Sequence, residues 1–445
     1  MAWPSLFNRY PLLYPDSITY VGDGRVVARA LFLHDLSDYY GMRSLIYSLG
    51  ILPFHWNFSL WPVVALHALL TAYIIWLVAR SILLRRTVLS YVVLIVLLSL
   101  LTSLSWFVSL IMPDILGPLL YLCIFLLVFA RETLSRVERV AVSAIAWWAM
   151  ASHMTHLMLA AGTCILLLFL LLIFRRHATL LRWRDVGQVA LIVLLAAGSQ
   201  LALHTYLYGK PSLGGDRPPY LMARVISDGP GRRYLEQHCA EAKFAICDGL
   251  RNLPDTADDF VWKENGIWYG ASDEMRERLR QEEIPFVLAT LRAYPREQIS
   301  KSLANFWEQL TTFGFELDPN DWILKEFDDV LPRERTSYLR SRLAQNDIPF
   351  DFFELVQVWT VIASLAVIVL FIPRLWRRRP PRLLGLGGVI VFTVVANAFV
   401  TGAMSMVEDR YQGRVIWLVP FLAGVFFLDW LGDIRTKKVS RPIVA

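Results

Sequence analysis

Charged and phenolic side chains are concentrated in SMVEDRYQGR, residues 405–414, which lies between two of the most apolar runs of the chain. A turn between two membrane helices needs only a few polar residues to stay in water, so this density of charge indicates a binding role. Snorkelling of arginine side chains accounts in part for Arg410 and Arg414, but it does not account for the adjacent acids.

Acidic residues also occur near the start of the chain, in YPDSITYVGDG (14–24) and HDLSD (34–38). Asp16 follows Pro15 and precedes Ser17, a spacing that is typical of a helix cap. The alternative is catalytic, because a carboxylate at this place can accept the proton of an acceptor hydroxyl group. The sequence leaves both interpretations open.

Two histidines, His153 and His156, lie in SHMTH (152–156). Three residues apart on a helix, they would share a face. They can then bind a metal ion or the phosphate of a ligand, or they can be hydrogen-bonded at a helix end. Because ionisable residues near membrane depth tend to face a cavity rather than lipid, the pair is a candidate for ligand contact.

Further arginines lie in PSLGGDRPPYLMARVISDGPGRRYL (211–235), with Arg224 and Arg232 as the candidates. DGPGRRY predicts a turn that starts a helix, in which case the arginines belong to a solvated face. If they face a membrane cleft instead, they suit a phosphate or an acidic sugar.

Four cysteines are present, and two of them, Cys239 and Cys247, are close together in HCAEAKFAIC. In an oxidising compartment this spacing predicts a structural disulfide that closes a small loop. Two cysteines alone do not indicate a metal site.

The elements that carry these clusters are predicted to be membrane helices. The chain has 445 residues, of which 56% are hydrophobic, and a mean hydropathy of +0.45, above that of an ordinary soluble protein. Crossing roughly 30 Å of hydrocarbon takes about 20 apolar residues. Nine candidate runs, of which the third and fourth are short, lie at 59–81, 88–111, 115–130, 140–153, 156–174, 186–206, 355–373, 384–404 and 415–431.

Arginine-rich loops follow the first, third, fifth, seventh and ninth of these runs, and the positive-inside rule makes all of them cytoplasmic. Basic residues that contribute to the net charge of +6 cluster in these loops, so they report the orientation of the chain and do not indicate nucleic-acid binding. The clusters described above all face outward in this topology. The N-terminus then faces outward, and no long apolar run precedes the one at 59–81. Either the chain inserts by this run, or an upstream helix is missing from this sequence.

The sequence therefore predicts an all-α polytopic membrane protein with about nine transmembrane helices. The expected parts are an outward-facing loop with membrane-surface helices at 1–58, transmembrane helices at 59–206, a mostly helical outward domain at 207–354, further transmembrane helices at 355–431, and a cytoplasmic tail at 432–445.

Several catalytic signatures are absent from the sequence. There is no Walker A motif, no Rossmann glycine fingerprint, no GxSxG, no HExxH and no DxD-type sugar-nucleotide site. ATP-driven transport and cytosolic sugar-nucleotide chemistry are therefore not expected.

This pattern resembles the GT-C superfamily of integral-membrane glycosyltransferases, which have many transmembrane helices, an acidic first outward loop and an outward domain late in the chain. YPDSITY is similar to the first-loop segment of bacterial members. VEDRYQGRVIWLVPFLAG (407–424) is similar to the last outward turn and helix of uncharacterised bacterial relatives, and distantly to the RY-containing loop of lipid-linked aminosugar transferases. SHMTH is similar to a histidine pair in the same relatives. The chain departs from the family in lacking a helix before the acidic loop and in having separated acids there.

The resemblance implies a role for each cluster. Asp16 would be the catalytic base, with Asp35 as a further first-loop candidate, and Arg410 and Arg414 would contact the lipid phosphate. The wider phosphate-binding set adds Tyr411, His153 and His156, and the supporting residues are Glu408, Asp409, Arg224 and Arg232.

The resemblance further implies an inverting transfer of a sugar from a polyprenyl-phosphate donor to a glycan, lipid or protein acceptor. The reaction would take place at the outer face of a bacterial inner membrane, with the large domain periplasmic and membrane lipids around the helices. No cofactor is assigned, and a divalent cation is left open. The alternative is a non-catalytic transporter, flippase or assembly factor for a lipid-linked glycan.

Overall fold

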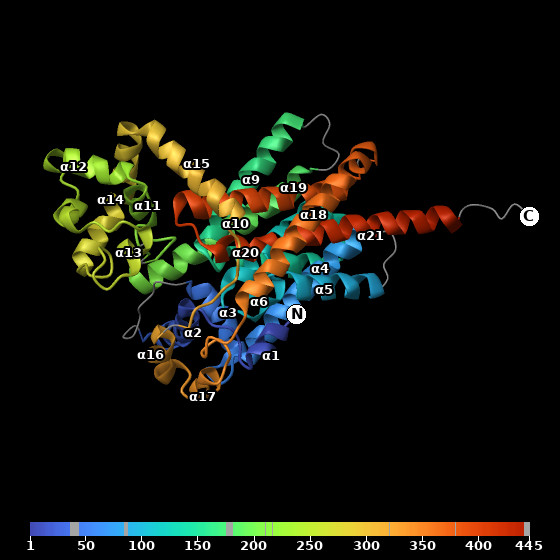
Figure 1. Ribbon diagram of the computed structural model, residues 1–445, viewed down its shortest axis with the longest axis horizontal. Helices are drawn as coiled ribbons and strands as arrows, with labels where there is room; N and C mark the ends of the chain where they lie inside the picture. Colours follow the sequence, from blue (N-terminus) through green and yellow to red (C-terminus); the bar gives the residue numbers. More distant parts are fainter. Residues whose placement is uncertain are drawn as a thin grey trace, which may run out of the picture. The chain divides into compact units, whose positions relative to one another are not determined.

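The computed structural model describes residues 1–35, 44–83, 88–174, 181–209, 211–215, 217–319, 321–378 and 380–439. In these ranges all regular structure is helical, apart from one isolated bridge between Leu12 and Leu110 (Figure 1). The chain forms two compact units. Unit 1 comprises Met1–Gly215, Gly314–Thr393 and Gly413–Ala445, and unit 2 comprises Asp216–Phe313 and Val394–Gln412.

Unit 1 contains the apolar helices and the N-terminal segment. Its first helices are α1 (Trp3–Asn8), α2 (Pro15–Leu33), α3 (Leu45–His55), α4 (Trp61–Ile82), α5 (Val88–Leu101), α6 (Leu104–Ser109), η1 (Pro113–Ile115), α7 (Leu116–Phe129), η2 (Arg131–Thr133), α8 (Arg136–Ala151), α9 (Met154–Phe174) and α10 (Trp183–Tyr208). Its later helices are α16 (Asp321–Val330), α17 (Arg335–Leu339), α18 (Phe350–Arg378) and α21 (Leu418–Val439).

The chain passes between the units within two further helices. These are α19 (Pro381–Ala398), which ends in the π-helical turn η4 (Phe399–Ala403), and α20 (Asp409–Ile416).

Helix α7 lies at the centre of unit 1. Its residues Leu116–Val128 are all buried, which fits a sequence that is apolar on every face. A helix of this kind needs protein around it on all sides, and α4, α8, α9 and α10 pack against it.

Six helices in the described ranges are long and apolar enough to cross a membrane, so the protein is an all-helical membrane protein. They are Trp61–Ile82, Met154–Ile173, Trp183–Tyr208, Phe350–Arg378, Pro381–Ala403 and Asp409–Ile434. The expectation of nine spans is not confirmed. Two of the expected runs form α7 and α8, of 14 and 16 residues, and 14 residues reach only about 21 Å.

The expected span 88–111 is interrupted in the structure. Helix α5 ends at Leu101 and α6 begins at Leu104, because Ser103 between them forms bonds to other parts of unit 1. The Ser103 amide donates to Gln357 Oε1 at 2.6 Å, and its hydroxyl donates to the Gly413 carbonyl at 2.7 Å. These bonds tie the break to α18 and α20 and compensate for the lost helical ones.

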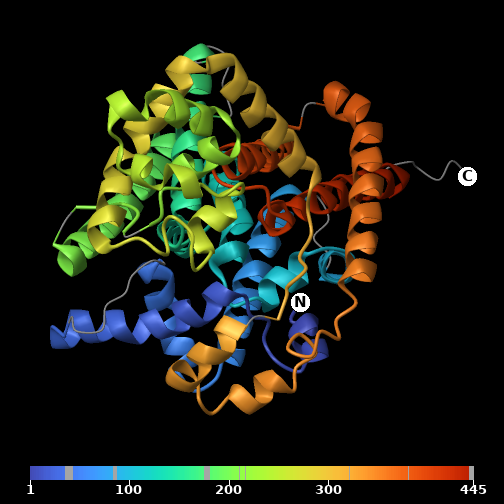
Figure 2. The ribbon, with the colours of Figure 1, turned by 60° about the vertical axis from the view of Figure 1, so that its left-hand side comes forward.

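The N-terminal segment packs against residues that follow Gly314. Helix α16 lies beside α2 in both views (Figures 1 and 2). The Asn8 side chain accepts from the Leu343 amide at 2.8 Å, and Tyr10 donates to Glu334 at 2.5 Å. Residues 314–354 therefore belong to unit 1, whereas the sequence placed them in an outward domain at 207–354.

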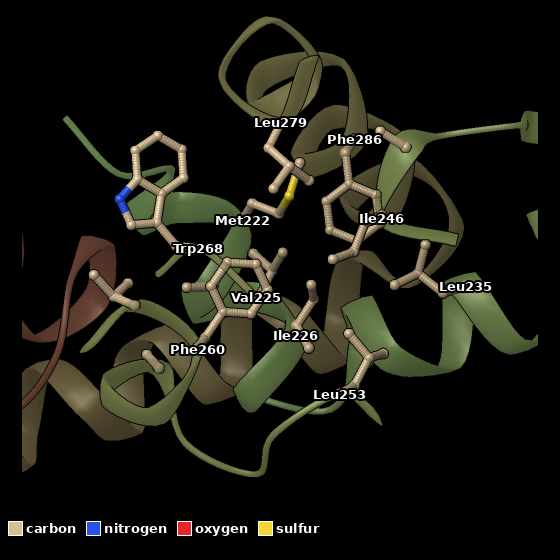
Figure 3. Packing of buried hydrophobic residues seen from close by; sticks show 14 residues of the cluster. Met222, Val225, Ile226, Leu235, Ile246, Leu253, Phe260, Trp268, Leu279 and Phe286 are labelled. Carbon is tan, nitrogen blue, oxygen red and sulfur yellow. The ribbon is translucent and has the colours of Figure 1, made fainter. Parts of the chain in front are cut away.

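Unit 2 has its own apolar core. Its helices are α11 (Tyr220–Ser227), α12 (Pro230–Ala242), η3 (Ala245–Asn252), α13 (Ala257–Trp262), α14 (Asp273–Ala293) and α15 (Pro295–Thr311). Met222, Phe260, Leu279 and Phe286 converge in this core, as Figure 3 shows. The side chains come from helices α11, α13 and α14, so these helices are held together by burial of apolar surface.

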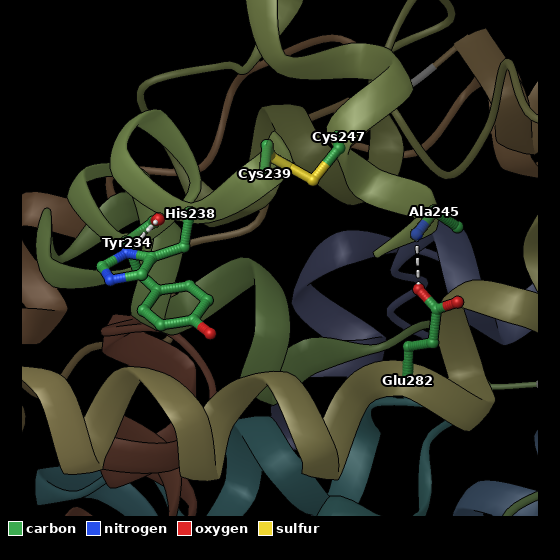
Figure 4. The surroundings of a disulfide bond; sticks show 6 residues. All are labelled: Tyr234, His238, Cys239, Ala245, Cys247 and Glu282. Carbon is green, nitrogen blue, oxygen red and sulfur yellow. Dashed lines mark hydrogen bonds between the residues drawn. A yellow bond between two sulfur atoms is a disulfide. The ribbon is translucent and has the colours of Figure 1, made fainter. Parts of the chain in front are cut away.

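A disulfide joins Cys239 of α12 to Cys247 of η3 in unit 2, with Cα atoms 5.6 Å apart (Figure 4). The loop that it closes is also held from α14, where Glu282 accepts from the Ala245 amide at 2.6 Å.

Candidate functional site

Two Pro-Asp pairs in unit 1 begin helices in the same register. The bridge between Leu12 and Leu110 is parallel, with the Leu12 amide bonded to the Ser109 carbonyl and the Ile111 amide to the Leu12 carbonyl, both at 3.0 Å. Four residues beyond the bridge on each side stand Asp16 and Asp114. The equal register brings two acidic helix starts into one neighbourhood.

Asp16 occupies the first turn of α2, and it is not the residue that caps the helix. Tyr14 is the N-cap, Pro15 is the first helical residue, and the Tyr14 amide donates to Ser17 Oγ at 2.9 Å. Proline is suited to the first helical position because its missing N–H would have no partner there. Its neighbours supply the cap, and the half-buried Asp16 side chain stands at the N-terminus of the helix.

Asp114 forms a buried ion pair with Arg414. Both residues are 3% exposed, and 3.5 Å separates Arg414 Nη1 from Asp114 Oδ1. The guanidinium comes from α20, where Trp417 Nε1 donates to the Arg414 carbonyl at 3.0 Å. Removing water from two charges is costly, and a pair at this distance recovers less of that cost than one at about 2.8 Å would. The sequence did not identify Asp114 as a site residue.

His156 belongs to the same group. It is 2% exposed, its Nδ1 lies 3.0 Å from the Ala149 carbonyl, and its charged neighbours are His153, Arg414 and Asp114. In the described part of the chain, its Nε2 has no hydrogen-bond partner. A polar atom buried without a partner is costly, so this nitrogen is a candidate to meet a ligand.

The two histidines lie at a helix junction and not on one continuous helix. Helix α8 ends at Ala151 and α9 begins at Met154, so His153 stands between them. The ring centroids are 5.2 Å apart. Gly117 makes room for the pair, since a Cβ atom at that position would lie 2.8 Å from His156 Nε2.

Aromatic residues connect the acids to the rest of unit 1. Tyr20, one turn after Asp16 on α2, lies with its ring centroid 5.1 Å from that of Tyr47. Burial raises the pKa of the Tyr47 phenol well above its usual range, and Tyr20 and Asp114 add to this effect. The Tyr47 hydroxyl lies 3.2 Å from His67 Nε2. Tyr47 thus lies near both α2 and Asp114, in agreement with the register of the two helix starts.

Asp35 does not join this group. Helix α2 has 19 residues and is about 28 Å long, so Asp16 and Asp35 stand at its opposite ends. Asp35 forms an ion pair with Arg29 there. Its expected catalytic role stays a prediction. Asp38, also part of that acidic segment, lies outside the described residues.

Residues 405–412 of this segment belong to unit 2, whereas Gly413 and Arg414 belong to unit 1. The Arg410 guanidinium lies 5.3 Å from the centre of the Tyr411 ring. Gln309 holds the backbone of Glu408, donating to its carbonyl at 2.8 Å and accepting from its amide at 2.9 Å. Asp409 begins α20. The phosphate roles of Arg410 and Tyr411, and the supporting roles of the two acids, stay predictions.

Arg224 and Arg232 form contacts within unit 2. Arg224 pairs with Asp228 at 3.0 Å, and Asp228 is buried. Arg232 donates to the Leu253 and Pro254 carbonyls at 3.2 and 2.9 Å. These contacts give both arginines a structural role in holding the unit together, and their expected support of a phosphate stays a prediction.

Neither a metal cluster nor a relative guides the interpretation of the site. In the described ranges, no group of three or more His, Cys, Asp or Glu side chains is arranged to hold a metal ion. A comparison with protein-family models found no match, and comparisons with curated proteins and with solved structures found none either.

Proposed function

We propose that the protein is a membrane glycosyltransferase of the GT-C kind, which moves a sugar from a polyprenyl-phosphate donor to an acceptor hydroxyl group. The observation that carries this proposal is the grouping of two acidic helix starts with a buried arginine and an unpartnered histidine nitrogen in the unit that holds the apolar helices. A phosphate-bearing lipid needs a cation near apolar surroundings, and transfer to a hydroxyl group needs a base.

Asp16 is the proposed base. Its carboxylate would take the proton of the acceptor hydroxyl group while that oxygen forms a bond to the anomeric carbon of the sugar. The bond between this carbon and the phosphate oxygen breaks on the opposite face, and its electron pair leaves with the polyprenyl phosphate. The configuration is inverted, and no nucleotide is consumed, because the donor phosphate is itself the leaving group.

Arg414 is the proposed phosphate ligand, and its pairing with Asp114 gives it a defined resting partner. Phosphate oxygens would compete with the Asp114 carboxylate for the guanidinium, and a bidentate contact with phosphate would favour the exchange. The positive charge would then stabilise the negative charge that grows on the departing phosphate. His156 Nδ1 donates to the Ala149 carbonyl, so Nε2 of the neutral ring would accept a second hydrogen bond, from a hydroxyl group of the sugar or of the acceptor.

The orientation of the reaction follows from the arginine distribution in the sequence. It predicts that the helix starts of Asp16 and Asp114 face the outer side of the membrane. We therefore propose an inner-membrane protein of a bacterial cell that works on the periplasmic side, with a glycan, lipid or protein as acceptor.

The test is a glycan and lipid profile of a strain that lacks the protein, followed by a transfer assay with purified protein and polyprenyl-phosphate sugars. We expect one glycan to lack a sugar in the deletion strain, and the assay to restore that sugar from one donor. Unaltered glycans and lipids in the deletion strain would contradict the proposal.

A carrier of lipid-linked glycans is the second candidate, and the buried charges of Asp114 and Arg414 favour it, since transporters place such residues along their pathways. The two candidates differ in their product. A carrier moves the intact lipid-linked glycan across a vesicle membrane, whereas a transferase releases free polyprenyl phosphate.

A further inference from the structure

Helix α15 (Pro295–Thr311) of unit 2 buries polar side chains and exposes apolar ones. Its buried side chains are Gln298, Asn305 and Gln309. Three large apolar side chains, spaced four residues apart, are more than half exposed: Ile299 at 54%, Leu303 at 55% and Trp307 at 64%. A helix on the surface of a water-soluble domain shows the opposite pattern.

The buried polar face of α15 is hydrogen-bonded inside unit 2. Gln298 and Asn305 each donate to the Asp228 carboxylate at 2.9 Å. Gln309 bonds to both backbone groups of Glu408. These bonds fix the rotation of the helix, so the apolar side chains are held outward by the fold.

Helix α15 packs on the end of a membrane-spanning helix. Its neighbour is η4 (Phe399–Ala403), which closes the candidate span Pro381–Ala403. The two backbones approach closely, since a Cβ atom at Gly402 would lie 2.5 Å from the Asn305 carbonyl oxygen. Close approach at a small residue is typical of helix pairs in membranes.

The exposed face of that span adjoins α15. Val395 and Phe399, one turn apart in the segment that belongs to unit 2, are 43% and 45% exposed. The Phe399 ring lies 6.2 Å from the ring of Phe306 on α15. A spanning helix exposes such residues to lipid, so the adjoining stripe lies at the same depth.

We propose that α15 is embedded in the outer boundary of the bilayer, with Ile299, Leu303 and Trp307 in contact with lipid acyl chains. The charged residues Arg296, Glu297 and Lys301 lie in its first two turns and would stay among headgroups and water. The later part carries Trp307, and tryptophan favours the membrane interface. Unit 2 is thus anchored through a helix that is too polar overall to be recognised as a membrane segment.

The experiment uses the full-length protein in vesicles of phosphatidylethanolamine and phosphatidylglycerol. A polarity-sensitive fluorophore is attached to a cysteine introduced by Leu303→Cys or Trp307→Cys. The matched control is Glu236→Cys on the exposed face of α12 in the same unit. The native cysteines are buried or disulfide-bonded and do not compete for the label.

We expect lipids with a nitroxide on the acyl chain to quench positions 303 and 307 at least about threefold more than position 236, while iodide in the buffer quenches only position 236. If iodide quenches all three positions alike, the stripe faces water and the proposal is wrong. If neither quencher reaches positions 303 and 307, protein covers the stripe, a second copy included, and the proposal is equally wrong. Circular dichroism checks that each variant keeps its helices.

Discussion

Two buried aspartates, Asp228 and Asp114, each form an ion pair with an arginine, and the surroundings of the two pairs differ. In unit 2, Asp228 accepts from Arg224 at 3.0 Å and from the amides of Gln298 and Asn305 at 2.9 Å. In unit 1, Asp114 and Arg414 are 3.5 Å apart. The first carboxylate is held by an arginine and two amides of its own unit, whereas the second lies near His156 and Tyr47.

The comparison separates a structural pair from a candidate functional one. Short bonds to three donors compensate for the burial of Asp228, and they leave it little reason to exchange partners. Asp114 and Arg414 lie beside a histidine nitrogen without a partner in the described part of the chain, and such a nitrogen suits a place where a ligand arrives. We expect changes at the first pair to affect folding and changes near the second to affect chemistry.

Asp16→Asn should have the largest effect. Loss of a general base lowers the rate of transfer by about 10²- to 10⁴-fold. The melting temperature should change little, because Tyr14 and Ser17 cap the helix without Asp16. The measurement is the rate of sugar transfer by the purified variant. The control is Asp35→Asn, because Asp35 stands at the other end of α2. If Asp35→Asn loses activity and Asp16→Asn keeps it, the base has been assigned to the wrong end of the helix.

Asp228→Ala should destabilise the fold and leave the chemistry intact. Removing one member of a buried pair costs about 3–5 kcal/mol, because the remaining Arg224 charge has no counterion. The matched control is Glu297→Ala, which breaks the exposed pair with Arg233 and should cost at most about 1 kcal/mol. Thermal unfolding in detergent measures both variants. Equal melting temperatures, or a loss of transfer by the folded Asp228 variant, would remove the distinction between the two buried pairs.

Arg414→Lys should have an intermediate effect. The charge is kept but the bidentate contact is lost, so donor affinity should fall about tenfold, equivalent to about 1.4 kcal/mol. Binding of polyprenyl phosphate by the purified protein measures this change. An unchanged affinity would mean that Arg414 serves Asp114 alone, as Arg224 serves Asp228.

The smallest effect is expected at a third pair, Arg80 and Glu138, which is partly exposed. Its two bonds of 2.7 and 2.8 Å lower the pKa of Glu138 to about 2. A depressed pKa stabilises the fold above the unfolded value of 4.5, and this contribution is lost as the pH falls from 4.5 towards 2. Glu138→Gln should therefore lower stability at pH 7 by about 1 kcal/mol or less, and make it less sensitive to pH in that window. Melting curves of the unaltered protein and of Glu138→Gln at pH 3 and pH 7 measure the difference. If the melting temperature falls equally in both proteins between pH 7 and pH 3, the Arg80–Glu138 pair is not the source of the pH dependence.

The helical class could be predicted because long apolar runs report a membrane environment directly. The disulfide could also be predicted, since Cys239 and Cys247 are close in sequence. The break at Ser103 could not, because its bonding partners Gln357 and Gly413 are distant in the chain. Packing decides such a break, since Thr102 and Ser103 do not by themselves end a helix.

Half of the candidate site was accessible from the sequence. Asp16, Arg414 and the two histidines stand out as charges in apolar surroundings. Asp114 was missed, although LLYPD (12–16) and LIMPD (110–114) share a pattern that would have paired the two acids. The position of His153 between two helices was missed as well: both histidines were placed on one helix, although the predicted runs 140–153 and 156–174 already put a junction at these residues.

The central claim is that the group around Arg414 and Asp114 binds the phosphate of a polyprenyl lipid, and photolabelling measures this directly without knowledge of the sugar. A polyprenyl phosphate with a photoreactive group near the phosphate is crosslinked to the purified protein, and the labelled peptides are identified by mass spectrometry. We predict labelling of peptides that contain Asp114, His156 or Arg414, competition by unlabelled polyprenyl phosphate, and loss of the label in Arg414→Ala but not in Glu297→Ala. Labelling that is spread over the apolar helices, and that neither competitor nor variant reduces, would contradict the account.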